Sequence, residues 1–224
     1  KGWQPIIYKT TNFGVSWAQI PGIDFNAPGF SPVKSSLASV NVSPTLEVPF
    51  FKVDEGYDVT VDINGKLHIL STVVGTSSQH NDSLEYTYQF GAQGYNWPHT
   101  PGNRPYIYDF IGDGNGPWSF VLVDSMPSEV PGSVPSAPGY TDNPWDIDQN
   151  SKVSSDARMQ LSRTPDGQYI VYSWAESDTN FTASQVKWNT IPNIKVRAMI
   201  TGTSNILSTT EVNLTKPTPP IPGF

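Results

Sequence analysis

Hydrophobic and polar residues alternate along several short stretches of this chain, and turn-forming residues separate these stretches. Residues 58–62 (DVTVD) alternate, the turn INGK follows, and residues 67–74 (LHILSTVV) lead back. An Asn-Gly pair between two β-rich stretches is the strongest short signal for a β-hairpin. The pattern therefore predicts two antiparallel strands joined by this turn.

The same pattern recurs later in the chain, where RMQLSR, the turn TPDGQ and YIVYSW follow one another. Aligning Gly65 with Gly167 keeps the alternation of the second strand in step. Leu67, Ile69 and Ser71 then fall on Tyr169, Val171 and Ser173. Because side chains alternate between the two faces of a sheet, this alignment predicts that both copies present the same face.

A second pair of strands is expected after each hairpin. Strand patterns cover residues 106–111 and 118–124 after the first hairpin, and 194–201 and 206–214 after the second. Two four-stranded antiparallel meanders are therefore predicted at residues 56–126 and 157–215, and residues 1–20 hold the last two strands of a third unit. Repeated sheets of this kind are typical of the blades of a β-propeller.

These units amount to about two and a half blades, fewer than the roughly four to eight that close a propeller. We therefore expect an all-β chain that is a fragment of a longer protein or that completes its ring with another chain. An open β-sandwich is the alternative architecture. The intervening segments are predicted to be an irregular linker at residues 21–55, a Pro/Ser-rich acidic loop at 127–156 and a Pro-rich linker at 216–224.

Composition supports an all-β fold and narrows the partners. Among 224 residues only 15% are charged, whereas Gly 18, Pro 21 and 12% aromatic residues suit many short strands and turns. The net charge of −7, from 13 Lys+Arg against 20 Asp+Glu, argues against nucleic acid as a partner. No run approaches the roughly 18 apolar residues of a membrane span, so no membrane insertion is expected. The absence of cysteine excludes disulfides and thiol chemistry.

The stretch TTNFGVSW carries a specific spacing of small, polar and aromatic residues. Its defined positions are Thr10, Asn12, Gly14, Ser16 and Trp17. This spacing resembles the Asp box of sialidase-like β-propellers, with Asn in place of the usual Asp. The resemblance implies a turn between the last two strands of a blade, with Trp17 as a plug between blades. A degenerate second box, GDGNGPW, places Asp113 and Trp118 at the spacing of Asn12 and Trp17.

A second likeness concerns the stretch ARMQLSRTPDGQYIVYSWAESD and the strands after it, over about residues 100–215. It is similar to large repeat-blade surface proteins that Bacteroidetes export, commonly through the type IX system. The likeness implies a secreted or cell-surface location on the outer face of a Gram-negative bacterium. Two short stretches, residues 82–84 and 124–126, also match the O-glycosylation sequon of that phylum.

The set of catalytic residues that sialidases share is not apparent in this chain. A sialidase site needs three arginines around the substrate carboxylate, because a guanidinium fork suits that group. The Arg-Ile-Pro signature of the family is absent. Arg158 and Arg163 lie five residues apart on one predicted strand, so their side chains are expected to point to opposite faces of the sheet. The four arginines are Arg104, Arg158, Arg163 and Arg197.

Another glycosidase would need two carboxylates roughly 5–10 Å apart. Asp62, Asp109 and Glu176 lie on or beside predicted strands, and nothing in the sequence brings two of them together. We interpret them as solvated residues that cap turns. His68 is interpreted as a strand histidine packed beside a turn.

Two further sets of residues are candidates for ligand binding. Asp146, Asp148 and Asn150 alternate like the start of an EF-hand loop, which favours calcium, with Asp142 or Asp156 as a further ligand. However, Ser151 stands where that loop needs glycine. Aromatic residues in predicted loops could stack on a sugar, and these are Tyr95, Trp97 and Trp145.

The sequence favours a non-catalytic β-propeller region of a secreted or surface protein, in a binding, adhesion or display role. Its expected partners are a protein or glycan at the cell surface, or the remaining blades of the same polypeptide. The alternative is part of a sialidase-like or other glycoside hydrolase propeller whose catalytic residues lie largely outside this chain.

Overall fold

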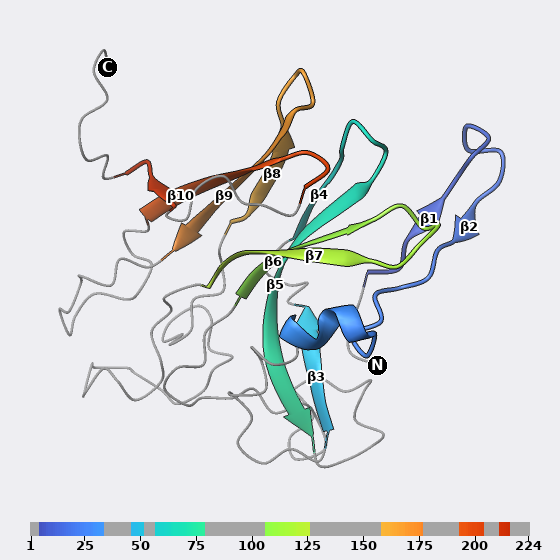
Figure 1. Ribbon diagram of the computed structural model, residues 1–224, viewed down its shortest axis with the longest axis horizontal. Coiled ribbons are helices and arrows are strands. Elements are labelled where there is room, and N and C mark those ends of the chain that lie inside the picture. Colours follow the sequence, from blue (N-terminus) through green and yellow to red (C-terminus); the bar gives the residue numbers. More distant parts are fainter. Residues whose placement is uncertain are drawn as a thin grey trace.

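The computed structural model describes residues 5–33, 46–51, 57–78, 106–125, 158–176, 193–203 and 211–215 (Figure 1). Within these ranges the protein is all-β, with antiparallel pairing throughout. Among the described residues, helix is found in a 3-10 turn, η1 (Pro28–Phe30), and in the helical residues 31–33 that follow it. The predicted all-β class is confirmed.

The first large sheet is an antiparallel meander with one added strand. Its meander runs in chain order through β4 (Tyr57–Val61), β5 (Leu67–Ser78), β6 (Tyr106–Gly112) and β7 (Ser119–Ser125). The added strand, β3 (Leu46–Phe51), pairs with the far end of β5. We expect an irregular linker at residues 21–55 from the sequence, but this segment supplies both η1 and β3, so the prediction is wrong in part.

The second large sheet is also a four-stranded antiparallel meander. It is formed by β8 (Gln160–Arg163), β9 (Tyr169–Glu176), β10 (Asn193–Ile200) and β11 (Val212–Asn213). A separate two-stranded hairpin, β1 (Tyr8–Lys9) and β2 (Ala18–Gln19), projects away from both sheets (Figure 1). Both predicted meanders and the N-terminal strand pair are present.

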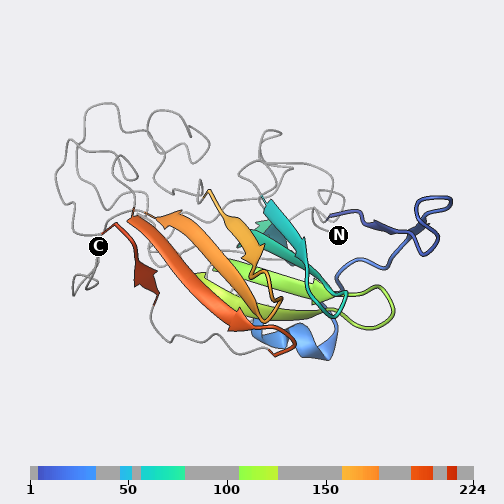
Figure 2. The same ribbon diagram turned by 90° about the horizontal axis from the view of Figure 1, so that it is seen from above.

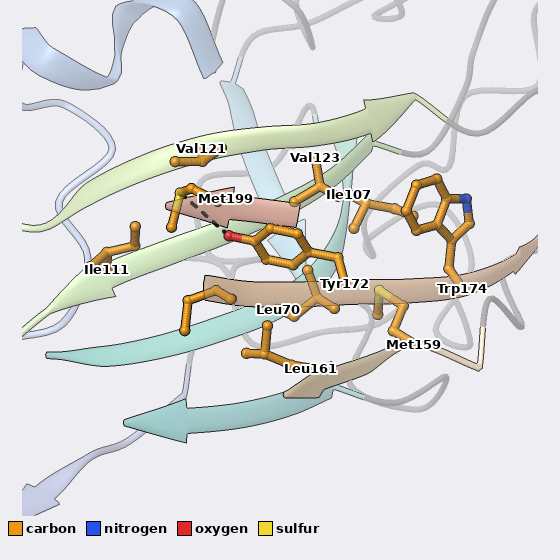
Figure 3. Packing of buried hydrophobic residues seen from close by; sticks show 11 residues of the cluster. Leu70, Ile107, Ile111, Val121, Val123, Met159, Leu161, Tyr172, Trp174 and Met199 are labelled. Carbon is orange, nitrogen blue, oxygen red and sulfur yellow. Dashed lines mark hydrogen bonds between the residues drawn. The ribbon is translucent and has the colours of Figure 1, made fainter. Parts of the chain in front are cut away.

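The two large sheets pack face to face around one hydrophobic core (Figures 2 and 3). Tyr172 and Trp174, on β9, are fully buried between them. The first sheet contributes Leu70, Ile107, Ile111, Val121 and Val123. The second sheet contributes Leu161, Ile170, Tyr172, Trp174 and Met199, and Met159 joins them from just before β8. Burial of these side chains is the main term that holds the sheets together.

The opposite face of the first sheet is covered by the N-terminal segment. Aromatic rings dominate this second core, and Phe25 meets Phe110 edge to face with ring centroids 5.8 Å apart. The segment contributes Ile23, Phe25, Phe30 and Val33 against Ile69, Val73, Tyr108, Phe110 and Trp118 of the sheet. The first sheet thus lies between the second sheet and the N-terminal segment (Figure 2).

The first strands of the two sheets, β4 and β8, lie side by side and run in the same direction. The amide of Leu161 donates to Asp58 Oδ2 at 2.8 Å, and Arg163 Nη1 donates to the carbonyl of Val61 at 3.1 Å. The later residue of β8, Arg163, contacts the later residue of β4, Val61, so the two strands are parallel. The two meanders are therefore stacked in parallel, with first strand beside first strand.

The two hairpins differ by one residue, and this changes which residues correspond. Val61 pairs with Leu67 across the turn of residues 62–66, whereas Arg163 pairs with Ile170 across residues 164–169. Tyr172, rather than Val171, therefore takes the place of Ile69. The prediction that alignment on the glycines keeps the same sheet face is wrong for the second strand, because a shift of one residue reverses the face.

Candidate functional site

The most unusual feature between the sheets is a buried polar cluster of Asp62, His68, Asp109 and Tyr172. His68 Nδ1 lies 2.6 Å from Asp109 Oδ2, and His68 Nε2 lies 3.5 Å from Asp62 Oδ2. The hydroxyl of Tyr172 donates to the same Asp109 oxygen at 2.7 Å. Asp109 is therefore shared by a histidine of its own sheet and a tyrosine of the other.

The register of the strands brings these side chains together. Asp109, on β6, pairs with Leu70 of β5, so His68 is its diagonal neighbour on the same face. Asp62 directly follows β4, at the turn that leads into β5. Its Oδ1 accepts from the amides of Asn64 and Lys66, which leaves Oδ2 to face His68.

All four side chains are buried, with exposed fractions of 3% for Asp62, 1% for His68 and 0% for Asp109 and Tyr172. Burial lowers the pKa of His68, but the hydrogen bonds and negative charges of Asp109 and Asp62 outweigh it and raise that pKa above its ordinary value. Burial and the adjacent Asp109 carboxylate raise the pKa of Tyr172, so its hydroxyl stays protonated and acts as a donor.

The structure corrects our interpretation of the strand acids. Asp62 does cap its turn, as expected, but it is buried rather than solvated. Asp109 lies in the middle of β6, and His68 joins it to Asp62. His68 does pack beside a turn as predicted, and that turn contains Asp62. The side chain of Glu176 lies outside the described part of the structure.

The cluster is suited to holding a proton and linking the sheets. Asp109 approaches Nδ1 of His68 and Asp62 approaches Nε2, so the two carboxylates lie on different sides of the ring and do not converge on one point. Among the described residues no group of three or more His, Asp or Glu side chains could hold a metal ion. Near-complete burial leaves no access for a substrate at these four side chains.

The turn of residues 10–16 uses every polar position of its motif. Asn12 Oδ1 accepts from the Ser16 amide at 2.9 Å, and Asn12 Nδ2 donates to Ser16 Oγ at 2.8 Å. Thr10 Oγ1 accepts from the Gly14 amide at 2.9 Å. Phe13 and Gly14 have φ of 55° and 89°, a left-handed pair that tightens the turn. The motif therefore fastens a hairpin.

The two tryptophans of the repeated spacing lie in different environments. Trp118 is 8% exposed, packs over Gly112 and donates from Nε1 to the carbonyl of Pro21 at 2.9 Å. Trp17 is 61% exposed, so the expectation that it acts as a plug is wrong in this structure. Residues 21–33 cover Trp118, and no described segment covers Trp17.

The second turn also joins the hairpin to the first sheet. Asp113 Oδ1 accepts from the amide of Asn115 at 2.8 Å. This hydrogen bond and the nearby charge of Lys9 lower the pKa of Asp113. Lys9 Nζ donates to the carbonyl of Asp113 at 2.6 Å, which ties β1 to the β6–β7 turn.

The remaining candidate residues divide into those with observed contacts and those outside the described ranges. Arg197 contacts the carbonyl of Val123 and lies 3.5 Å from Glu211 Oε2, between the sheets. Arg158 precedes β8 rather than lying on it. Outside the described residues lie Arg104, the loop aromatics Tyr95, Trp97 and Trp145, and the calcium candidates Asp142, Asp146, Asp148 and Asn150.

Comparison with known proteins assigns no family. No family model, no curated protein and no solved structure matches the chain. In the parts of the chain that the structure describes, no helix has the length and apolar character needed to cross a bilayer.

Proposed function

We propose that the hairpin and the two sheets are successive layers of a β-propeller, in a non-catalytic binding or display region of a secreted or surface protein. The observation that carries this proposal is the parallel stacking of equivalent meanders, with β4 beside β8. Neighbouring blades of a propeller stack in this sense, so that each blade meets the next through unlike faces. A sandwich of two sheets related by a twofold axis would bring like faces together.

The N-terminal hairpin supports the same arrangement. Ile20 packs against Gly114 and, together with Ile7, against the core on the outer face of the first sheet. By the spacing of the two turns, Ile20 corresponds to Val121, which faces the second sheet. The base of the hairpin therefore contacts the outer side of the first sheet beside residues 21–33, although its tip projects away.

The described charged residues favour a non-catalytic role. Asp62 and Asp109 are buried on two sides of His68. Arg163 and Arg197 bind backbone carbonyls, so these two guanidinium groups already have partners inside the protein. The secreted or surface location rests on the resemblance to exported repeat-blade proteins.

The tip of the hairpin is our candidate for the binding surface. Phe13, Val15 and Trp17 are 104%, 84% and 61% exposed on a turn held by side-chain hydrogen bonds. Rigid, exposed aromatic groups bind partners with little loss of conformational entropy. The expected partner at this tip is an apolar or sugar surface outside the cell.

Three measurements test the proposal. An experimental structure should show β4 parallel to β8, and packing of like sheet faces would refute the propeller. A panel of fluorogenic glycosides, sialosides included, should show no turnover above blank. Turnover that copurifies with the protein would instead favour the glycoside hydrolase alternative.

On a glycan array, Phe13→Ser and Trp17→Ser should abolish any retention, whereas the control Val212→Ser, at an exposed position of the second sheet, should not.

A further inference from the structure

The polar cluster between the sheets contains two carboxylates and one histidine ring. With Asp62 and Asp109 ionised, a protonated His68 brings the net charge of the cluster to −1, and a neutral His68 leaves it at −2. All three groups are at most 3% exposed, so little water screens the difference. The folded protein therefore favours the protonated ring.

Loss of the proton would affect the two carboxylates differently. A neutral ring can keep its proton on Nδ1 and continue to donate to Asp109 at 2.6 Å. Nε2 would then present a lone pair to Asp62 Oδ2, 3.5 Å away, in place of a positive N–H group. Asp62 would remain buried with no opposing charge from His68.

The same cluster bridges the two sheets. Asp109 Oδ2 accepts from His68 on one side and from Tyr172, in the opposite sheet, on the other. Among the described residues, Asp109 Oδ1 and His68 Nε2 are buried without a hydrogen-bond partner. The inter-sheet hydrogen bond therefore depends on a carboxylate whose main counter-charge is His68.

We propose that Asp62, His68, Asp109 and Tyr172 form a pH-sensitive latch between the two sheets, which is closed when His68 is protonated and loosened when it loses its proton. Among the described residues, the titratable groups in contact with His68 are Asp62 after β4 and Asp109 on β6, and Tyr172 on β9 contacts the same Asp109 oxygen. Arg163, on β8, is directed to the carbonyl of Val61. The latch lies away from the exposed hairpin and does not depend on the proposed binding role.

The sign of the pH dependence follows from the direction of the shift. Because the pKa of His68 is raised in the folded protein, its contribution to stability is complete below the unfolded value of about 6.5. The contribution is lost as the pH rises through the higher folded value. Each unit between the two values corresponds to about a tenfold change in the unfolding equilibrium constant.

The experiment is an NMR titration of the histidine rings combined with urea unfolding at pH 6 and pH 9. The His68 resonance, assigned by its loss in His68→Gln, should titrate with a midpoint above pH 6.5. The urea midpoint of the wild type should fall from a higher value at pH 6 to a lower value at pH 9. A double variant, His80→Gln with His99→Gln, should keep that fall, whereas His68→Gln should lose it. A His68 midpoint at or below 6.5, or an unchanged pH dependence in His68→Gln, would overturn the latch. In the double variant the one remaining histidine resonance belongs to His68, so the titration decides the matter even if His68→Gln does not fold.

The inter-sheet role is tested separately with Tyr172→Phe. This variant should lower the urea midpoint at both pH values while His68 still titrates above 6.5. Tyr169→Phe, on the same strand but 36% exposed, is the matched control and should leave the midpoint unchanged. If the two variants behave alike, the cluster does not hold the sheets together.

Discussion

Gly167, in the turn between β8 and β9, lies directly against Ile63, in the turn between β4 and β5. A Cβ added at Gly167 would lie 2.9 Å from Ile63 Cβ, whereas one added at Gly65 would meet nothing within 4 Å. The two glycines have similar φ values of 71° and 77°. They therefore differ mainly in whether the turn touches the neighbouring sheet.

This pair gives a matched test of the stacking. Gly65→Ala should cost about 1–2 kcal/mol of unfolding free energy, because its backbone is left-handed. Gly167→Ala should cost roughly a further 1–3 kcal/mol, because the new methyl group must displace Ile63. Urea unfolding measures both, and adding Ile63→Gly, which removes the contacting Cβ, should remove the excess at Gly167 but not the cost at Gly65. Equal costs at the two glycines would contradict the contact between the turns.

A second prediction compares the two tryptophans that share the turn spacing. Trp118→Phe should destabilise the protein by about 1–3 kcal/mol, because the hydrogen bond to the carbonyl of Pro21 is lost and the buried ring becomes smaller. Trp17→Phe should change the unfolding free energy by less than about 0.5 kcal/mol, because the side chain is 61% exposed. Thermal or urea unfolding of both variants checks the difference, and a large effect at Trp17 would show that this ring is buried in solution.

A third prediction concerns the contact between β4 and β8. Asp58→Ala should weaken the stacking by about 1 kcal/mol, because the amide of Leu161 loses its acceptor at 2.8 Å. Asp58→Asn keeps an oxygen at this place and is the matched control. Amide hydrogen exchange at Leu161 should accelerate about fivefold in Asp58→Ala, which corresponds to that energy, and only slightly in Asp58→Asn. Equal rates in the two variants would place the acceptor elsewhere.

A fourth prediction separates the role of the side-chain oxygen of Asn12 from that of its side-chain nitrogen in the N-terminal turn. Asn12→Ala should accelerate amide exchange at Ser16 by roughly fivefold, because Asn12 Oδ1 is the acceptor of that amide and such a bond contributes about 1 kcal/mol. Asn12→Asp keeps the oxygen, so Ser16 should stay protected. If Asn12→Asp exchanges as fast as Asn12→Ala, the side-chain nitrogen, which donates to Ser16 Oγ, is the group that holds the turn.

Local turn chemistry was enough to predict much of the fold. The Asn-Gly and Asp-Gly turns predicted both hairpins, and alternation predicted the strands that follow them. In contrast, β3 was missed because Pro49 lies within LEVPFF and no turn signal links this stretch to β5. A proline is tolerated there because β3 is an edge strand.

The polar cluster could not have been predicted from sequence spacing. His68 and Asp109 are separated by a long connection, and Tyr172 belongs to a different sheet. Their meeting depends on strand register and on how the sheets stack, and neither leaves a local pattern. The only available signal was a histidine in the otherwise apolar and β-branched stretch LHILSTVV, together with an aspartate inside YIYDFI.

The stacking through unlike faces gives the molecule a direction. Each added layer covers the open face of the layer before it and leaves its own equivalent face open, so no layer ends the series by its own geometry. Interfaces of this kind either close into a ring or continue as an open fibre. Solubility of such a protein therefore depends on how its two terminal layers are covered, and variants that uncover either end should aggregate before they lose their fold.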